Sequence, residues 1–173
     1  MRAKVGQAPA VVDHEVGSGE ALFACGLAGN PRSGNINGAG EKAWPCQRPP
    51  WGRLIAVNAA TGEFAWNVVL GVTDELPAEK RNTGRLSMGG PIATAGGLVF
   101  IGATNDRRFR AFDSKTGKML WESKLAMSAH AIPMTFTGKS GKQYVAITAG
   151  GASALDDPAP EGSEELMVFG LDR

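Results

Sequence analysis

The sequence predicts an all-β fold, and three observations lead to this expectation. The 173 residues include 24 glycines and 10 prolines, which leave little uninterrupted chain for helices of ordinary length. One segment recurs further along the chain, and strand-like runs separated by tight turns surround both copies. Four antiparallel strands within about forty residues have the size of one β-propeller blade. We therefore predict a partial β-propeller of about two and a half four-stranded antiparallel blades.

The repeat aligns residues 53–70 with residues 108–125 without gaps, at a constant offset of 55 residues. Arginine, alanine, threonine, glycine, tryptophan and leucine recur at the same places in both copies. Each copy reads as a strand, a turn and an outgoing strand that carries Trp66 or Trp121. An indole at a fixed position of each hairpin is suited to packing one sheet on the next.

The turn of each hairpin is predicted from its polar residue and its glycine. Asn58 and Asp113 occupy equivalent positions at the end of the incoming strand. Their short polar side chains can accept hydrogen bonds from backbone amides just ahead. Gly62 and Gly117 follow and adopt a positive φ at no steric cost.

Further strands are expected on both sides of these hairpins. In chain order the predicted strands are residues 54–58, 63–70, 91–94, 98–101, 109–113, 118–125, 131–136, 143–148 and 165–171. Residues 11–12 and 21–25 are candidates for two more short strands. Residues 30–40 are rich in Gly, Asn and Ser, which indicates a loop or a disordered segment.

This pattern divides the chain into four parts. Residues 1–44 form a partly disordered segment, and residues 45–88 form half a blade with a loop. Residues 89–128 form a complete blade, and residues 129–173 form a last blade that lacks its fourth strand. Because about two and a half blades cannot close a ring, we expect the remaining blades to lie outside this chain.

Composition and motifs exclude several classes of protein. The formal net charge of +1 disfavours nucleic acid or an anionic membrane as a partner. No stretch approaches the roughly 18 apolar residues of a spanning helix, and no signal peptide is visible. Cys25 and Cys46 belong to no CxxC motif, so they are either two small thiols or one disulfide. A metal site built from His14 and His130 is not predicted.

Two segments of the sequence contain candidate binding residues. The stiff, proline-rich loop PCQRPPWG at residues 45–52 carries Gln47 and Trp51 just before a strand. Trp51 is either a structural cap on a blade edge or a contact to a planar ligand at the mouth of the propeller. His130 precedes the first strand of a blade, and such connections line the mouth. It is either a partly buried, hydrogen-bonded histidine or a site residue.

Several segments in combination resemble the pyrroloquinoline-quinone (PQQ)-dependent dehydrogenases, closest to the glucose/quinate type. They are PCQRPPWG (45–52), the two hairpin repeats, MGGPIATAGGLVFIGATNDRRFRAFDSKTGKMLW (88–121), SAHAIPM (128–134) and GKQYVAITAGG (141–151). The resemblance covers about residues 45–173 and falls at the C-terminal end of the family. Residues 1–44 match it poorly.

The resemblance implies an eight-bladed propeller in the bacterial periplasm that oxidises a sugar or alcohol hydroxyl and passes electrons to quinone. It also implies PQQ near the propeller axis with a calcium ion, and a catalytic aspartate that takes the hydroxyl proton. That aspartate and most calcium ligands lie upstream of the matching region, so we predict no catalytic or metal residue in this chain. Asp113 matches a turn position instead. Gln47 is the first candidate for cofactor contact, followed by Trp51, Gly90 and His130.

Three hypotheses follow. In the first, the chain is the C-terminal part of a quinoprotein dehydrogenase, inactive without the N-terminal blades that complete its propeller. In the second, it is a non-catalytic propeller scaffold that binds a protein partner, similar to bacterial outer-membrane assembly lipoproteins. In the third, it is the product of a gene truncation. A partial ring exposes the faces of its terminal blades, including aromatic surface near Trp66 or Trp121, so we also expect self-association.

Overall fold

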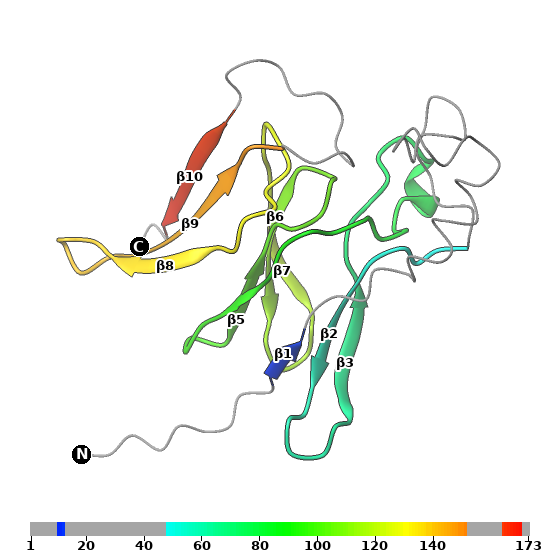
Figure 1. The fold of residues 1–173 in the computed structure, drawn as a ribbon, viewed down its shortest axis with the longest axis horizontal. Helices are drawn as coiled ribbons and strands as arrows, with labels where there is room; N and C mark the ends of the chain where they lie inside the picture. The colour runs from blue at the N-terminus through cyan, green and yellow to red at the C-terminus, as the bar shows by residue number, and fades with distance from the viewer. Residues whose placement is uncertain (1–9, 13–47, 152–163, 171–173) are drawn as a thin grey trace, which may run out of the picture.

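The computed structural model describes residues 10–12, 48–151 and 164–170, which form three antiparallel sheets (Figure 1). The first sheet contains β1 (Ala10–Val12), β2 (Arg53–Val57) and β3 (Phe64–Val69). The second contains β4 (Ile92–Ala93), β5 (Leu98–Ile101), β6 (Arg108–Asp113) and β7 (Met119–Lys124). The third contains β8 (Met134–Thr137), β9 (Gln143–Ala149) and β10 (Glu165–Gly170).

In the described ranges the sole helix is the single 3₁₀ turn η1 (Ala78–Lys80). The all-β prediction is therefore confirmed. No described helix has the length and apolar character needed to cross a membrane.

The two hairpin turns have the predicted geometry. Asn58 Oδ1 accepts a hydrogen bond of 2.9 Å from the amide two residues on. Asp113 Oδ1 accepts bonds of 3.0 and 2.8 Å from the amides two and three residues on. Gly62 and Gly117 adopt φ values of 75° and 70°. The same local chemistry therefore closes both copies of the repeat.

The first sheet contains a strand from the N-terminal part of the chain. Ala10 on β1 pairs with Val57 on β2, and Val99 on β5 pairs with Phe112 on β6. Because Val57 and Phe112 are equivalent in the 55-residue repeat, β1 occupies in the first sheet the position of β5 in the second. The strand predicted at residues 11–12 is confirmed, and the half blade expected from residue 45 gains a third strand. The strand candidate at residues 21–25 lies outside the described residues.

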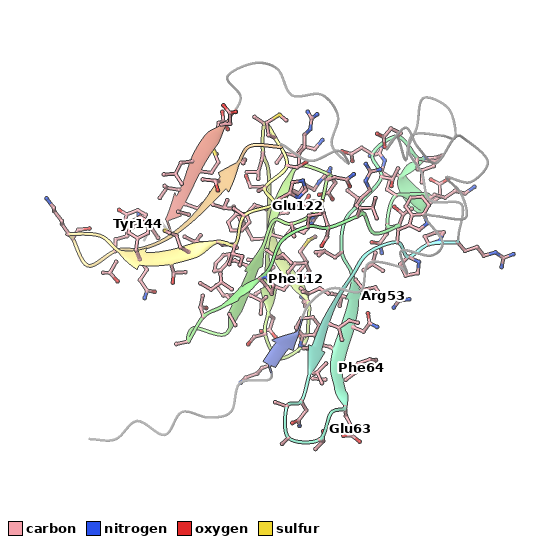
Figure 2. The ribbon with its side chains drawn as sticks, viewed as in Figure 1. Arg53, Glu63, Phe64, Phe112, Glu122 and Tyr144 are labelled. Atoms are coloured by element: carbon pink, nitrogen blue, oxygen red, sulfur yellow. The ribbon has the colours of Figure 1, made fainter. Side chains whose placement is uncertain are left out.

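The three sheets stack face to face, and an apolar core fills each of the two interfaces. On β6, Phe112 packs in the core shared with the first sheet (Figure 2), and Phe109 packs in the core shared with the third sheet. The first core comprises Leu54, Ala56, Trp66, Leu70, Val99, Ile101, Ala103 and Phe112. The second comprises Phe109, Leu125, Met127, Ala129, Val145, Ile147 and Ala149. Each large side chain buried here contributes about 1.5–3 kcal/mol, so these two cores hold the sheets together.

The outer face of the third sheet remains open. Met134 and Phe136 on β8 and Leu166 and Val168 on β10 have exposed fractions between 43% and 66%. The cross-strand pairs Met134–Ala146 and Val168–Ala146 place these side chains on one face, opposite the buried side of β9. Exposed aromatic surface was expected near Trp66 or Trp121. Trp66 is only 8% exposed, whereas 38% of Trp121 is exposed.

Connections at the two ends of the sheets differ in length. Tight turns at residues 58–63, 94–97, 114–118 and 138–142 join strands at one end. The other end carries the longer connections, of which the structure describes residues 48–52, 70–91, 102–107, 125–133 and 150–151. We call this the connection end. Trp51, Gly90 and His130 all belong to its connections, which is where binding residues concentrate on a rigid scaffold.

Candidate functional site

Backbone hydrogen bonds tie the connections of all three sheets into one platform. Residues 83–89 run through its centre and pair with the connection on each side. The bonds, as donor nitrogen to acceptor oxygen, are Trp51–Thr83 (2.6 Å), Asn105–Leu86 (3.1 Å), Met88–Ala103 (3.0 Å), Ala103–Ala129 (2.7 Å) and Gly151–Ser128 (3.0 Å). Buried backbone groups are thereby paired, so the connections hold side chains at defined positions.

Glycines permit this close approach of one connection to another. A Cβ atom on Gly52 would lie 2.2 Å from the backbone oxygen of Arg85. A Cβ atom on Gly89 would lie 2.7 Å from the backbone oxygen of His130. Gly52 of the PPWG motif and Gly89 of the MGGP motif therefore serve backbone packing, because a side chain at either position would separate the connections.

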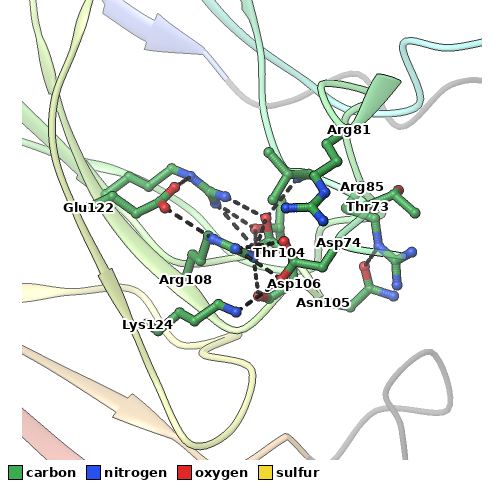
Figure 3. Close-up of polar contacts among 12 residues, drawn as sticks. Thr73, Asp74, Arg81, Arg85, Thr104, Asn105, Asp106, Arg108, Glu122 and Lys124 are labelled. Atoms are coloured by element: carbon green, nitrogen blue, oxygen red, sulfur yellow. Dashed lines mark hydrogen bonds and ion pairs between the residues drawn. The ribbon is translucent and has the colours of Figure 1, made fainter. Parts of the chain in front are cut away.

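Two arginines on β6 anchor the connection of residues 70–91 (Figure 3). Arg108 donates hydrogen bonds of 2.9 Å to both carboxylate oxygens of Asp74 and one of 3.0 Å to Glu122 Oε1. Lys124 Nζ lies 3.1 Å from Asp74 Oδ2. Burial alone would raise the pKa of Asp74, but the hydrogen bonds from Arg108 and Lys124 outweigh it, so that pKa lies below its ordinary value.

Arg110 forms the buried half of this network. Its guanidinium contacts the carboxylate of Asp106, whose side chain is 1% exposed, and donates 2.9 Å to Glu122 Oε2. The Thr104 hydroxyl donates 2.6 Å to Asp106 Oδ1, and the Val72 amide donates 2.9 Å to Asp106 Oδ2. Asp106 thus joins β6 to a connection 34 residues earlier. Because these carboxylates and arginines satisfy one another, we assign them a structural role.

Sequence reasoning missed this network, although the repeat contains a signal for it. Arg53 and Asn67 are the equivalents of Arg108 and Glu122, and Arg53 Nη1 donates 3.2 Å to Asn67 Oδ1. The cross-strand polar pair therefore recurs in both hairpins. The long-range partner Asp74 has no such local signal.

His130 is held by the backbone of the second sheet. Its Nδ1 lies 2.9 Å from the backbone oxygen of Ala103. A carbonyl oxygen can only accept, so Nδ1 carries the proton, and in the neutral ring Nε2 is an acceptor. His130 also lines an open pocket of about 520 Å³ between Met88 and the β9–β10 edge.

The platform separates two of the predicted cofactor-contact residues. Trp51 pairs with Thr83 at one end of the central segment, and His130 packs against Gly89 at the other end. Gly90 lies beside His130, and a Cβ atom there would meet only the Ile132 side chain, at 3.4 Å. Little of Trp51 is open to a ligand, because the residue is 6% exposed.

Several predictions concern residues that the structure does not describe. Gln47, the first candidate for cofactor contact, lies outside the described residues. The same is true of His14 and of both cysteines, so the choice between thiols and a disulfide stays open.

The described residues fit part of a cofactor site and not a metal site. Within the ranges 10–12, 48–151 and 164–170, no three His, Cys, Asp or Glu side chains gather where a metal ion could bind. What they provide is one imidazole at an open pocket and glycine-lined backbone beside it. Such a surface can contact a planar organic group but supplies no metal ligand set.

Stacked antiparallel sheets, with tight turns at one end and longer connections at the other, are the architecture of part of a β-propeller. Comparison with known proteins gives the family. Residues 28–145 match the family described as "PQQ: Glucose/ethanol/alcohol dehydrogenase, beta-propeller domain". The chain belongs to this family, which confirms the resemblance and the propeller fold predicted from the sequence.

Individual relatives agree with this family. The chain is 39% identical to the quinate/shikimate dehydrogenase (quinone) of Acinetobacter baylyi, over 75% of this chain and 16% of that protein. It is 40% identical to a probable quinate dehydrogenase (quinone) of Xanthomonas campestris pv. juglandis, over 90% of this chain and 21% of that protein. A solved structure titled "Europium-containing methanol dehydrogenase" is 34% identical to this chain, with a TM-score of 0.49. The match includes 64% of this chain and 16% of the chain in that structure. The chain therefore spans about a fifth or less of the length of these proteins.

Proposed function

We propose that this chain is the C-terminal part of a periplasmic PQQ-dependent dehydrogenase that oxidises a sugar or alcohol hydroxyl and passes the electrons to quinone. The observation that carries the proposal is the connection end. Its interlocked backbone holds Trp51, Gly90 and His130 on one platform, within a chain of the PQQ dehydrogenase family. Sites on rigid scaffolds are built from such connections.

In this proposal PQQ supplies the quinone that accepts the hydride. Gln47, Trp51, Gly90 and His130 contact the cofactor from this chain, with Trp51 acting mainly by fixing its connection. The base and the calcium ligands come from blades outside the chain. Asp74 and Asp106 are unsuited to that role because arginines and Lys124 engage them. The isolated chain is therefore expected to be inactive, and the N-terminal blades are its partner.

A chimera tests the proposal. The matching region of the Xanthomonas relative, which is 40% identical over 170 residues, is replaced by this chain. We expect the chimera to fold, to give a PQQ absorption spectrum and to oxidise substrate with an electron acceptor. The isolated chain with PQQ and calcium is the control and should show no turnover.

Two results would contradict the proposal. A folded chimera that gives no PQQ spectrum would argue against a cofactor role for this region. Turnover by the isolated chain would contradict the expected inactivity. Capture of a single protein partner by a chimera without cofactor would instead favour the scaffold hypothesis.

A further inference from the structure

The outer face of the first sheet repeats the face that the second sheet turns toward it. Leu54 and Ala56 of β2 lie in the core shared with the second sheet, so Arg53 faces the opposite side. The aligned residue of the second sheet is Arg108, whose guanidinium reaches Asp74 on the connection that leaves the first sheet. Arg53 thus occupies the position from which an arginine joins one sheet to the connection of the sheet before it.

The local surroundings of Arg53 also match, except that the carboxylate is missing. Arg53 lies opposite Val69 on β3, as Arg108 lies opposite Lys124 on β7. The half-buried Arg53 donates 3.2 Å to Asn67 Oδ1, which carries no charge. No carboxylate in the part of the chain that the structure describes forms an ion pair with Arg53. A guanidinium that loses water on this face therefore calls for an anionic partner.

The third sheet shows the reverse case, in which arginine and carboxylate are both absent. The cross-strand registers align Met167 of β10 with Arg110 of β6. Glu165, two residues earlier, therefore takes the position of Arg108. The connection before the third sheet, residues 125–133, contains no Asp or Glu. The arginine and the acidic residue of the preceding connection thus occur together in one interface and are both missing from the other.

We propose that the outer face of the first sheet receives a further sheet of the same propeller, and that Arg53 binds an aspartate or glutamate on the connection leaving that sheet. The carboxylate takes the role that Asp74 has toward Arg108. Two carboxylate oxygens match the paired N–H donors of a guanidinium. The inference rests on the proposed function, which places further blades outside this chain, and it adds the side chain by which one of those blades is held.

Carbodiimide coupling tests the pair in the chimera with the Xanthomonas relative. This reagent forms an amide between an amine and a carboxylate that touch, without a spacer. Lys124 Nζ lies 3.1 Å from Asp74 Oδ2, so this pair is an internal positive control. Val69 is the residue aligned with Lys124, and Val69→Lys places an amine beside the proposed carboxylate while Arg53 stays intact. We expect mass spectrometry to find a new link from residue 69 to an acidic residue of the preceding sheet's connection.

Arg53→Met measures what the ion pair contributes. In the isolated chain Arg53 has a neutral partner, so the half-life of unfolding at a fixed temperature should change by less than about 1.5-fold. In the chimera the variant leaves the proposed carboxylate unpaired, and the half-life should shorten at least about threefold. Arg108→Met is the matched control and should shorten the half-life of both proteins, because Asp74 belongs to this chain.

Two results would each overturn the proposal. One is a link between Lys124 and Asp74 without any link from residue 69, and the other is an equal effect of Arg53→Met in the chimera and in the isolated chain. If Val69→Lys misfolds, the Arg53→Met comparison decides. If the whole-chain chimera misfolds, a graft of residues 53–70 alone into the relative presents the same face to the same blades, and the link is sought there.

The same chimera separates this proposal from the proposed function. A link from residue 69 in a chimera that gives no PQQ spectrum would refute only the proposed function. A PQQ spectrum without that link would refute only the role of Arg53.

Discussion

The indole Nε1 of Trp66 on β3 donates a hydrogen bond of 3.0 Å to the backbone oxygen of Ser114, in the turn between β6 and β7. The repeat tryptophan of the first sheet is thus hydrogen-bonded to the hairpin turn of the second sheet. Gly117 in that turn packs directly against the same ring. A Cβ atom at this position would lie 2.7 Å from the ring atoms. Trp121, the equivalent residue of the second sheet, instead meets Phe169 of β10 edge to face at 5.0 Å.

Replacing Trp66 with Phe should lower the free energy of unfolding by about 1–3 kcal/mol, because it removes a partly buried hydrogen bond and indole volume. Trp121→Phe is the matched control and should cost less, since Trp121 is 38% exposed and its contacts with Phe109 and Phe169 are between rings, which a phenylalanine can also make. Urea denaturation followed by circular dichroism measures both. Equal losses would contradict the interface role of Trp66.

The contact of Gly117 with Trp66 predicts a difference between two equivalent glycines. Gly117→Ala and Gly62→Ala both place a Cβ on a left-handed backbone, at a cost of about 1–2 kcal/mol. At Gly62 nothing lies within 4 Å of that Cβ, whereas at Gly117 the Trp66 ring must move. Thermal unfolding should therefore show an extra loss of about 1–3 kcal/mol for Gly117→Ala. Identical losses would mean that the ring shifts freely.

Removal of the charge on Asp106 should destabilise the connection of residues 70–91. Asp106→Asn removes the buried carboxylate from Arg110 and leaves Glu122 as its partner, and we expect a loss of about 3–5 kcal/mol in unfolding free energy. Asp113→Asn is the control, because Asn58 performs the same turn role in the first hairpin, and it should change stability by less than about 0.5 kcal/mol. Proteolysis between residues 70 and 91 would report local release of the connection. If Asp106→Asn left the free energy of unfolding unchanged, a structural role for the network would be excluded.

The lowered pKa of Asp74 predicts that the stability of the fold depends on pH. Its folded-state pKa lies below the ordinary value of 3.8, because hydrogen bonds and charges of Arg108 and Lys124 outweigh its burial. The carboxylate therefore stabilises the fold above pH 3.8, and this stabilisation is lost as the pH falls through the folded pKa. Asp74→Asn should be less stable than wild type at pH 7, and the gap should shrink below pH 4. A gap that does not change with pH would contradict this assignment.

The open face of the third sheet predicts self-association. Leu166 and Val168 correspond in position to residues that the next sheet covers in the first two sheets, yet they are 66% and 48% exposed. Sedimentation should show oligomers of the wild-type chain that Leu166→Glu/Val168→Glu reduces. Phe64→Glu, on the exposed hairpin of the first sheet, is the control and should leave association unchanged. A monomer at high concentration would contradict the prediction.

Most of the strands could be predicted because their signals are local. Asn58, Asp113 and the two positive-φ glycines act within six residues of chain, so the turn chemistry alone places the hairpins. The run at residues 98–101 was predicted with the bounds that β5 has. The strand predicted to begin at residue 131 starts at Met134 instead, because Pro133 cannot donate to the ladder and ends the connection there.

The sequence by itself determined the hairpins, the stacking tryptophans and the family, because each is encoded by residues close together or repeated at a constant offset. Only the tertiary structure decided where β1 pairs, that Asp74 and Asp106 meet arginines 34 and 4 residues away, and that His130 bonds to Ala103, 27 residues earlier. Those contacts depend on how sheets and connections stack in space. No local sequence pattern marks the partners of such long-range contacts. The contacts form only when the apolar cores bring the sheets together.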